Sequence, residues 1–329
     1  MTHLPDTDPQ LTYEARGDRY RLAVLTGREL SYLLPLFHDV FGRRRFSADW
    51  LERKYAVEHG GARGFACAAF AQDGSPAGCV GMLPWPIRLG DRVETAAQIA
   101  DVATGSVHRG RGLAVRLDEL AREVCEAQGV TFIFGFPTET AFRIWLSKLG
   151  YLHVDDLVVY RIPVRTLWAE RAAPRIPALK RFYARYVERT LSAYAPADRV
   201  LENTLLRDGF AGTERDRAFY EYKSSFAGSR VVSLGGGRVW LAVRRGLLVG
   251  DFEAASSADL ERTVRELIEL ARRLGAHQIV FQASKLTRFS ELLPGRFHRS
   301  PGLPLIHKNL RSAIPHEKLR FTFGDLDNF

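Results

Sequence analysis

The segment from Gln98 to Leu117 combines residue types that suit anion binding. A strand-like stretch runs into His108-Arg109-Gly110-Arg111-Gly112 and continues directly as a helix-like pattern. The first amides of a helix lack intrahelical acceptors, and the helix dipole adds partial positive charge, so this end attracts phosphate. Glycine lets the backbone approach a diphosphate closely, and arginine adds full charge. The segment therefore predicts a site for a phosphate-rich molecule, with an ordinary strand-to-helix turn as the alternative.

Regular elements on both sides must position this turn. Residues 113–128 predict a helix whose apolar side chains share one face and which Gly129 ends. The apolar run Val130–Phe136 is typical of a buried central strand, and Glu94–Thr104 reads as the strand before the turn. The other predicted elements of this half are strands at 19–25, 64–71, 78–89 and 157–162 and helices at 29–41, 47–55 and 140–149.

The turn resembles a known motif. Arg109-x-x-Gly112-x-Ala114 is similar to the Gln/Arg-x-x-Gly-x-Gly/Ala acyl-CoA motif of the GCN5-related N-acetyltransferases, the GNAT superfamily. The order of elements is similar too, and AFRIWLSKLGY at 141–151 resembles the family helix that ends in Lys-Leu-Gly-Phe/Tyr. The resemblance covers about Arg19–Pro163. It implies an α/β fold with a mixed sheet, the GNAT acyl-CoA N-acyltransferase fold.

The resemblance also implies where acetyl-CoA, or another acyl-CoA, would lie. Backbone groups of Val102, Ala103 and Thr104 would pair with pantetheine as a further strand does. The pyrophosphate would bind to the backbone of Arg109, Gly110, Arg111, Gly112, Leu113 and Ala114. The thioester would lie where the strands 94–104 and 130–136 separate. No metal is implied.

A general base is harder to place. Residues 94, 96, 98 and 100 share one face of their strand, which presents Glu94 and Gln98, and Asp101 falls on the other face. GNAT proteins commonly have a bulge here, and a bulge at Val102 would turn Asp101 toward the acceptor. We therefore name Asp101 as the candidate catalytic base, with a structural hydrogen bond as its alternative. Leu146 stands where the family often has a tyrosine acid.

The second half of the chain partly repeats the first. Trp50-Leu51-Glu52-Arg53-Lys54 resembles Phe219-Tyr220-Glu221-Tyr222-Lys223, and strands at 231–234, 238–244 and 247–253 precede a helix at 258–274 and a strand at 278–282. A further helix is predicted at 286–293. Gly235-Gly236-Gly237 lies between two strands and predicts a hairpin turn. We therefore expect a duplicated fold whose second copy, lacking a glycine-arginine turn after its strand 247–253, binds no CoA.

This organisation divides the chain into four parts. We expect a flexible arm at 1–12, a CoA-binding GNAT domain at 13–163, a basic linker helix at 164–200 and a GNAT-like domain at 201–329. The linker segment has an apolar stripe and many arginines. A helix that faces a membrane or nucleic acid is the alternative to a packed linker with solvated arginines, which we favour.

Composition further restricts the classes of protein to which the chain can belong. The 329 residues are 46% hydrophobic and 26% charged, which excludes a disordered chain. The net charge of +9 comes mostly from arginine and favours an anionic partner, although arginine-rich coding gives the same bias. We expect a cytoplasmic protein for three reasons. The three cysteines lack metal-ligand spacing, no stretch is apolar enough to span a membrane, and the start MTHLPDTDPQ is polar.

The C-terminal segment FTFGDLDNF carries Asp325, Asp327 and the terminal carboxylate of Phe329. Some tandem acetyltransferases use a terminal carboxylate as base, whereas a docked tail with exposed acids is the interpretation that we favour.

Three functions remain open. The leading one is an acyl-CoA-dependent N-acyltransferase that acts on a small-molecule or peptide amine. The others are a FemABX-like transferase that uses aminoacyl-tRNA and a catalytically inactive CoA-binding protein. We expect no membrane span and no nucleic-acid partner, and a homodimer is left open.

Overall fold

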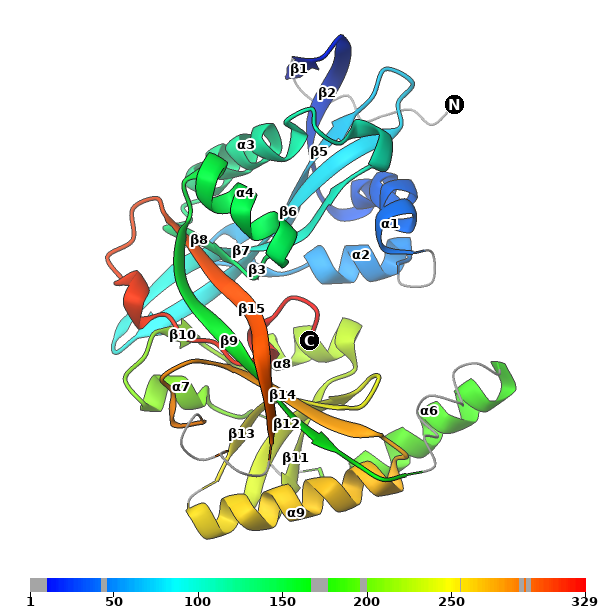
Figure 1. The fold of residues 1–329 in the computed structure, drawn as a ribbon, viewed down its shortest axis with the longest axis vertical. Helices are drawn as coiled ribbons and strands as arrows, with labels where there is room; N and C mark the ends of the chain where they lie inside the picture. The colour runs from blue at the N-terminus through cyan, green and yellow to red at the C-terminus, as the bar shows by residue number, and fades with distance from the viewer. Residues whose placement is uncertain are drawn as a thin grey trace. The chain divides into compact units, whose positions relative to one another are not determined.

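A computed structural model describes residues 11–42, 46–166, 177–195, 200–254, 256–289, 293 and 297–329. The chain forms two compact units (Figure 1). The first contains residues 1–87, 93–153 and 306–313, and the second contains residues 88–92, 154–305 and 314–329. The units therefore exchange segments, and this division differs from the expected boundaries at 163 and 200.

The first unit is a mixed sheet with helices. Its strand order is β1-β2-β5-β6-β7-β8, in which β7 and β8 are parallel. The elements are β1 (Thr12–Ala15), β2 (Asp18–Leu25), α1 (Leu34–Phe41), α2 (Ala48–Tyr55), β3 (Glu58–His59), β4 (Ala62–Arg63), β5 (Phe65–Phe70), β6 (Pro76–Leu89), β7 (Arg92–Thr104), α3 (Leu113–Ala127), β8 (Phe132–Gly135) and α4 (Glu139–Leu149), with a 3-10 helix at Gly27–Leu33. The core is buried between the sheet and α3, whose apolar face contributes Leu113, Leu117, Leu120, Ala121 and Cys125.

The second unit has the same kind of architecture. Its strand order is β15-β9-β14-β13-β12-β11, with β13 and β14 parallel. The elements are β9 (Leu152–Pro163), α6 (Pro177–Ser192), α7 (Thr204–Arg207), β10 (Gly212–Thr213), α8 (Arg217–Ala227), β11 (Arg230–Leu234), β12 (Gly237–Val243), β13 (Leu247–Glu253), α9 (Ser257–Arg273), β14 (Gln278–Ser284) and β15 (His298–Asn309). The order α8-β11-β12-β13-α9-β14 repeats α2-β5-β6-β7-α3-β8.

Two strands pair outside the half of the chain in which the sequence places them. β9 follows the helices of the first unit, but it pairs antiparallel with β14 from Leu157 to Pro163. β15 follows the second unit, but its residues Ile306–Asn309 pair antiparallel with β8. We did not predict β15, because Pro301, Gly302 and Pro304 weaken its strand pattern.

Most of the predicted elements are confirmed. Ser47 caps α2 by accepting from the Trp50 amide, and Gly235 and Gly236 form the two-residue turn between β11 and β12 with φ of 59° and 86°. Residues 12–15, which we assigned to the end of a loose arm and the loop after it, are a strand. Residues 1–10 and much of the predicted helix 286–293 lie outside the described residues.

Candidate functional site

The glycine-arginine turn joins β7 to α3, as the sequence predicts. Gly112 has a φ of 76° and caps α3 in the left-handed conformation, while Gly110 has a φ of 73°. The amides of Val115 and Arg116 both bond to the Gly112 carbonyl. The amides of Leu113 and Ala114 precede these bonds at the start of α3, where a helix has no acceptor for them. The turn therefore presents the donors that an anion needs.

The φ of Gly112 favours glycine, and a side chain at this position would also have to displace the hydroxyl of Tyr13. A Cβ built there would lie 2.7 Å from the hydroxyl of Tyr13. That hydroxyl donates to the carbonyl of Arg111 over 2.8 Å, so the β1–β2 hairpin fixes the backbone of the turn.

The two arginines of the motif have different surroundings. The Arg111 guanidinium donates to the Asp18 carboxylate and to the Val107 carbonyl, each over 2.5 Å. Arg109 is exposed, as are Gly110 and Gly112. Arg111 is therefore paired with an acidic side chain of the protein, and its guanidinium links the β1–β2 hairpin to the turn.

The strands β7 and β8 separate next to this turn. Their parallel pairing covers only Ala96–Gln98 with Phe132–Phe134, after which β8 ends at Gly135 and β7 continues to Thr104. Val102, Ala103 and Thr104 therefore lie on the part of β7 that has no β8 residue opposite. The separation of the strands is confirmed, and it leaves an edge that can pair with an extended ligand.

Asp101 interrupts β7. Its φ of 47° is left-handed, which is rare for a residue other than glycine, so β7 is irregular at Asp101, next to the position where a bulge is expected. Its Oδ2 accepts from Lys54 Nζ over 2.7 Å and from the Tyr55 hydroxyl over 3.0 Å. Among the described residues Oδ1 has no hydrogen-bond donor, and the side chain is 10% exposed. Two residues of α2 thus hold the Asp101 carboxylate through Oδ2, and Oδ1 is not used in these contacts.

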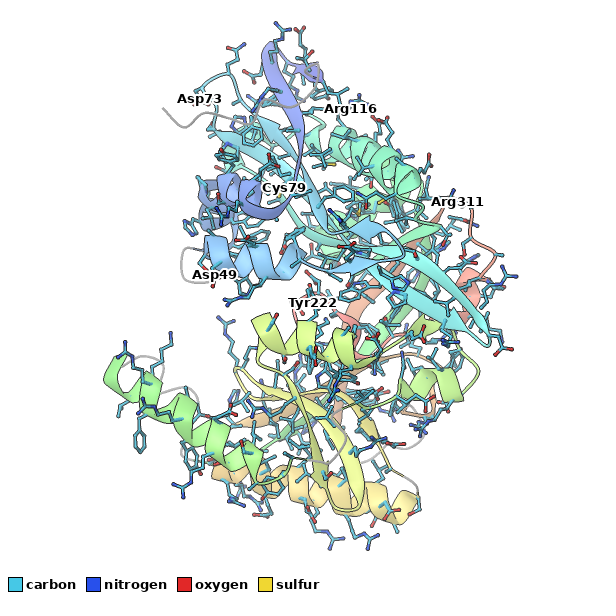
Figure 2. All side chains as sticks on the ribbon, turned by 180° about the vertical axis from the view of Figure 1, so that it is seen from behind. Asp49, Asp73, Cys79, Arg116, Tyr222 and Arg311 are labelled. Carbon is cyan, nitrogen blue, oxygen red and sulfur yellow. The ribbon has the colours of Figure 1, made fainter. Side chains whose placement is uncertain are left out.

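The backbone of Asp101 is tied to β6. Cys79 (labelled in Figure 2) donates its thiol to the Asp101 carbonyl over 3.1 Å. Burial, with the nearby Asp101 charge, raises the pKa of the Cys79 thiol well above its ordinary value. Cys79 therefore stays protonated and serves as a donor, which stabilises the irregular strand.

Lys54 is a site residue that sequence reasoning missed. Its side chain is 1% exposed and lies over the Trp50 ring at 5.3 Å. The repeated segment places Lys223 5.7 Å from the Phe219 ring in the same way. The repeat was visible in the sequence, and a lysine at the same place in both copies was the signal that could have identified a buried cation.

Other polar candidates have structural partners. Gln98 is buried and accepts from Trp85 Nε1 over 2.9 Å, and Glu94 accepts from the Ala313 amide over 3.1 Å. Tyr151 is buried and donates to Asp118 over 2.8 Å. Leu146 is half-buried against the apolar core. These contacts leave Asp101 as the carboxylate at the separation of β7 and β8.

The corresponding place in the second unit is built differently. β13 and β14 pair over Leu247–Val249 and Ile279–Phe281, and α9 begins at Ser257, after the N-cap Ser256, whose hydroxyl accepts from the Asp259 amide over 3.1 Å. This helix satisfies its own first turn with a polar cap and has no glycine-arginine turn before it.

The C-terminal tail fills the space between β13 and β14. The Ser284 amide donates to the Phe321 carbonyl over 2.9 Å, and Thr322 forms an isolated antiparallel β-bridge with Ala283. The ring of Phe329 lies on Gly250 of β13, where a Cβ would come within 2.6 Å of it. The place where strands separate in the first unit is therefore occupied by this chain's own residues in the second.

A buried ion cluster anchors this tail. Arg215 donates to Asp325 over 2.8 Å and to Asp251 over 2.6 Å, and all three side chains are fully buried. Lys223 donates to the Leu326 carbonyl over 2.6 Å. The tail is docked as predicted, but the prediction of exposed acids is wrong for Asp325, because Arg215 binds it inside the unit. Asp327 is half-buried.

Two kinds of feature are absent from the described residues. No group of three or more His, Cys, Asp or Glu side chains there is arranged to hold a metal ion. None of the described helices is both long and apolar enough to cross a membrane.

Comparisons with known proteins agree with this geometry. Residues 21–153 match the model of the acetyltransferase (GNAT) domain, whereas no curated protein matches the chain. Three solved structures share the fold. They are a conserved protein of Enterococcus faecalis (13% identity, 88% of this chain and 72% of that one, TM-score 0.57), a GCN5-related N-acetyltransferase of Kribbella flavida (16%, 88% and 72%, 0.55) and Eis1 of Mycobacterium abscessus (14%, 93% and 83%, 0.51).

Proposed function

We propose, from the match of residues 21–153 to the GNAT acetyltransferase domain, that the protein transfers an acyl group from an acyl-CoA, acetyl-CoA in the first instance, to a primary amine. The observation that carries the proposal is the left-handed Gly112 cap at the start of α3, placed directly after an edge of β7 that β8 leaves open. Phosphate donors and a pairing edge thus follow one another along the chain, as an acyl-CoA requires.

In this proposal the backbone binds the co-substrate. Amides from Arg109 to Ala114 receive the pyrophosphate, and Val102, Ala103 and Thr104 pair with the pantetheine arm. The thioester then lies beside Asp101, at the point where β7 and β8 separate. The sharp backbone turn at Asp101 is consistent with this arrangement, because it directs the side chain away from the regular strand positions.

Asp101 is the proposed general base. An alkyl amine has a pKa near 10, as lysine does, so nearly all of it is protonated at neutral pH. Oδ1 of Asp101 would accept a proton from the ammonium group, and the neutral amine would attack the thioester carbonyl. As the C–S bond breaks, the new amide nitrogen would lose its second proton and the departing thiolate of CoA would take up one proton. Lys54 and Tyr55 hold the carboxylate through Oδ2 and leave Oδ1 for this step. Leu146 supplies no acid for the leaving thiolate.

The second unit is proposed to be a degenerate copy that binds no CoA. Its helix α9 is capped by Ser256, and its tail occupies the space between β13 and β14. The repeated element order and the reciprocal placement of β9 and β15 support an origin by duplication. The four parts expected from the sequence remain our proposal for the domain organisation, with these two strands exchanged.

The test is an acyl-transfer assay with the full chain. Acetyl-CoA is incubated with a panel of small-molecule and peptide amines, and both free thiol and the mass of the acceptor are followed. Thiol release together with acetylation of an amine supports the proposal. Binding of acetyl-CoA without transfer would support an inactive CoA-binding protein, and stabilisation by aminoacyl-tRNA but not by acetyl-CoA in a thermal-shift assay would support the tRNA-dependent alternative.

A further inference from the structure

The tip of the β1–β2 hairpin carries an arginine in an unusual conformation. Ala15 pairs with Asp18, so Arg16 and Gly17 form the two-residue turn, with φ of 51° and 84°. Both positions of such a turn are left-handed, and glycine, asparagine or aspartate occupy them most easily. Arginine is strained there, so its presence calls for a reason other than turn formation.

The side chain of Arg16 reaches the glycine-arginine turn. A Cβ built on Gly110 would lie 3.8 Å from Nη1 of Arg16, which places the guanidinium beside the exposed Gly110 backbone. The hairpin is held in this position by two contacts described above, from Tyr13 to the Arg111 carbonyl and from Arg111 to Asp18. The β1–β2 hairpin, which these two contacts hold in place, therefore positions the guanidinium of Arg16 next to the turn.

The charges around the turn distinguish Arg16 from its neighbours. Arg111 is paired with Asp18, and Arg19 of the same hairpin lies 3.7 Å from Glu14. Arg16 is exposed and forms no ion pair within the described residues. Arg16, like the exposed Arg109 of the turn itself, thus keeps its charge available to a ligand, whereas Arg111 and Arg19 each have an acidic partner.

We infer that Arg16 binds a phosphate group of the acyl-CoA. This inference rests on the proposed function and adds a binding residue that lies outside the family match at 21–153 and outside the glycine-arginine motif. The planar guanidinium offers paired donors that fit phosphate oxygens. The nucleotide half of CoA carries this chemistry twice, in its pyrophosphate and in its 3′-phosphate, and both are candidates for the contact.

The experiment compares Arg16→Asn with the unmodified protein. Asparagine is well tolerated in the left-handed conformation, so the turn keeps its shape while the charge is lost. The Kd values of CoA and of dephospho-CoA, which lacks the 3′-phosphate, are measured by calorimetry at low and high salt. We expect the Kd of CoA to rise about tenfold in Arg16→Asn at low salt, less at high salt, and the melting temperature to stay equal or rise.

The pattern of the two ligands identifies the phosphate. If Arg16→Asn loses affinity for CoA alone, Arg16 binds the 3′-phosphate. If it loses affinity equally for CoA and dephospho-CoA, Arg16 binds the pyrophosphate. Arg19→Gln, which removes a charge from the same hairpin, is the control and should change neither Kd. Unchanged affinity of Arg16→Asn for both ligands overturns the inference while the proposed function stands. Absence of CoA binding to the unmodified protein overturns the proposed function itself.

Discussion

Lys54 and Asp101 form a nearly buried ion pair, with 2.7 Å between Nζ and Oδ2 and exposed fractions of 1% and 10%. The two residues are 47 positions apart and join the helix α2 to the irregular point of β7. Removing one member of such a pair leaves a buried charge without its partner, so a variant at Asp101 affects stability as well as any chemistry.

The first prediction separates these two effects. Asp101→Asn should lower turnover by roughly 10²–10⁴-fold if Asp101 is the base, and should also lower the free energy of unfolding by about 3 kcal/mol, because the buried Lys54 loses the carboxylate that balances it. The double variant Lys54→Met with Asp101→Asn should regain much of that stability but none of the turnover. Turnover per folded molecule and urea unfolding are measured on one preparation.

Two observations complete this test. The loss of turnover in Asp101→Asn should shrink from pH 6 to 9.5, because more of the amine arrives neutral. Arg53→Met on the same helix removes an exposed ion pair with Asp49 and should leave both quantities unchanged. If the double variant recovers both stability and turnover, Asp101 is a structural residue.

The second prediction concerns Gly112. Gly112→Glu adds a side chain where φ is 76° and where a Cβ would lie 2.7 Å from the Tyr13 hydroxyl, and it adds a negative charge beside the proposed pyrophosphate. Calorimetry should show that CoA binding is abolished. Gly90→Glu is the matched control, because Gly90 has a φ of 58° and nothing within 4 Å of its built Cβ. A folded Gly112→Glu protein with unchanged affinity would refute the assignment of the turn.

The third prediction is the stoichiometry. One CoA should bind per chain, because Ser256 caps α9 and the C-terminal tail fills the space between β13 and β14. A calorimetric titration of the full chain measures this number directly. Two equivalent sites would show that the second unit retains the function we assign to the first alone.

The fourth prediction tests the anchoring of the tail. Asp325→Asn removes one of the two carboxylates that balance the fully buried Arg215, and we expect a loss of about 3 kcal/mol in the free energy of unfolding. Asn328→Ala changes an exposed side chain of the same tail and should be neutral. Equal stability of the two variants in urea would contradict the buried cluster.

The fifth prediction follows from the raised pKa of Asp118, the buried acid that accepts a hydrogen bond from Tyr151 in the first unit. Burial raises the pKa of Asp118, against the hydrogen bond from Tyr151 and the charge of Arg122. Its contribution to stability is therefore fully present below the ordinary pKa of 3.8 and is lost as the pH rises through the raised folded value. In Asp118→Asn this loss should disappear. The free energy of unfolding of the variant should therefore rise relative to that of the unmodified protein as the pH rises.

Urea unfolding across this pH range measures the difference. Asp73→Asn should show the opposite trend, because hydrogen bonds from Ser75 lower the pKa of Asp73 and the stability they contribute is lost as the pH falls. Parallel pH profiles for Asp118→Asn and the unmodified protein would argue against the raised pKa.

The sequence alone determined the parts of this protein that depend on neighbours in the chain. The helix 113–127, the glycine turn before it, the hairpin turn at Gly235 and Gly236 and the Ser47 cap all follow from local conformational preferences and from the spacing of apolar residues. The acyl-CoA motif could be found for the same reason, since strand, turn and helix are consecutive.

Tertiary structure decided the features that join distant segments. The burial of Lys54 against Asp101, the pairing of Arg111 with Asp18, the strand β15 and the tail seated against Arg215 each depend on contacts that local patterning does not encode. Proline and glycine hid β15, although long-range pairing with β8 outweighs their weak strand preference. Charge balance in particular is set by which side chains meet in space, and so only the folded chain distinguished Arg16 from Arg111.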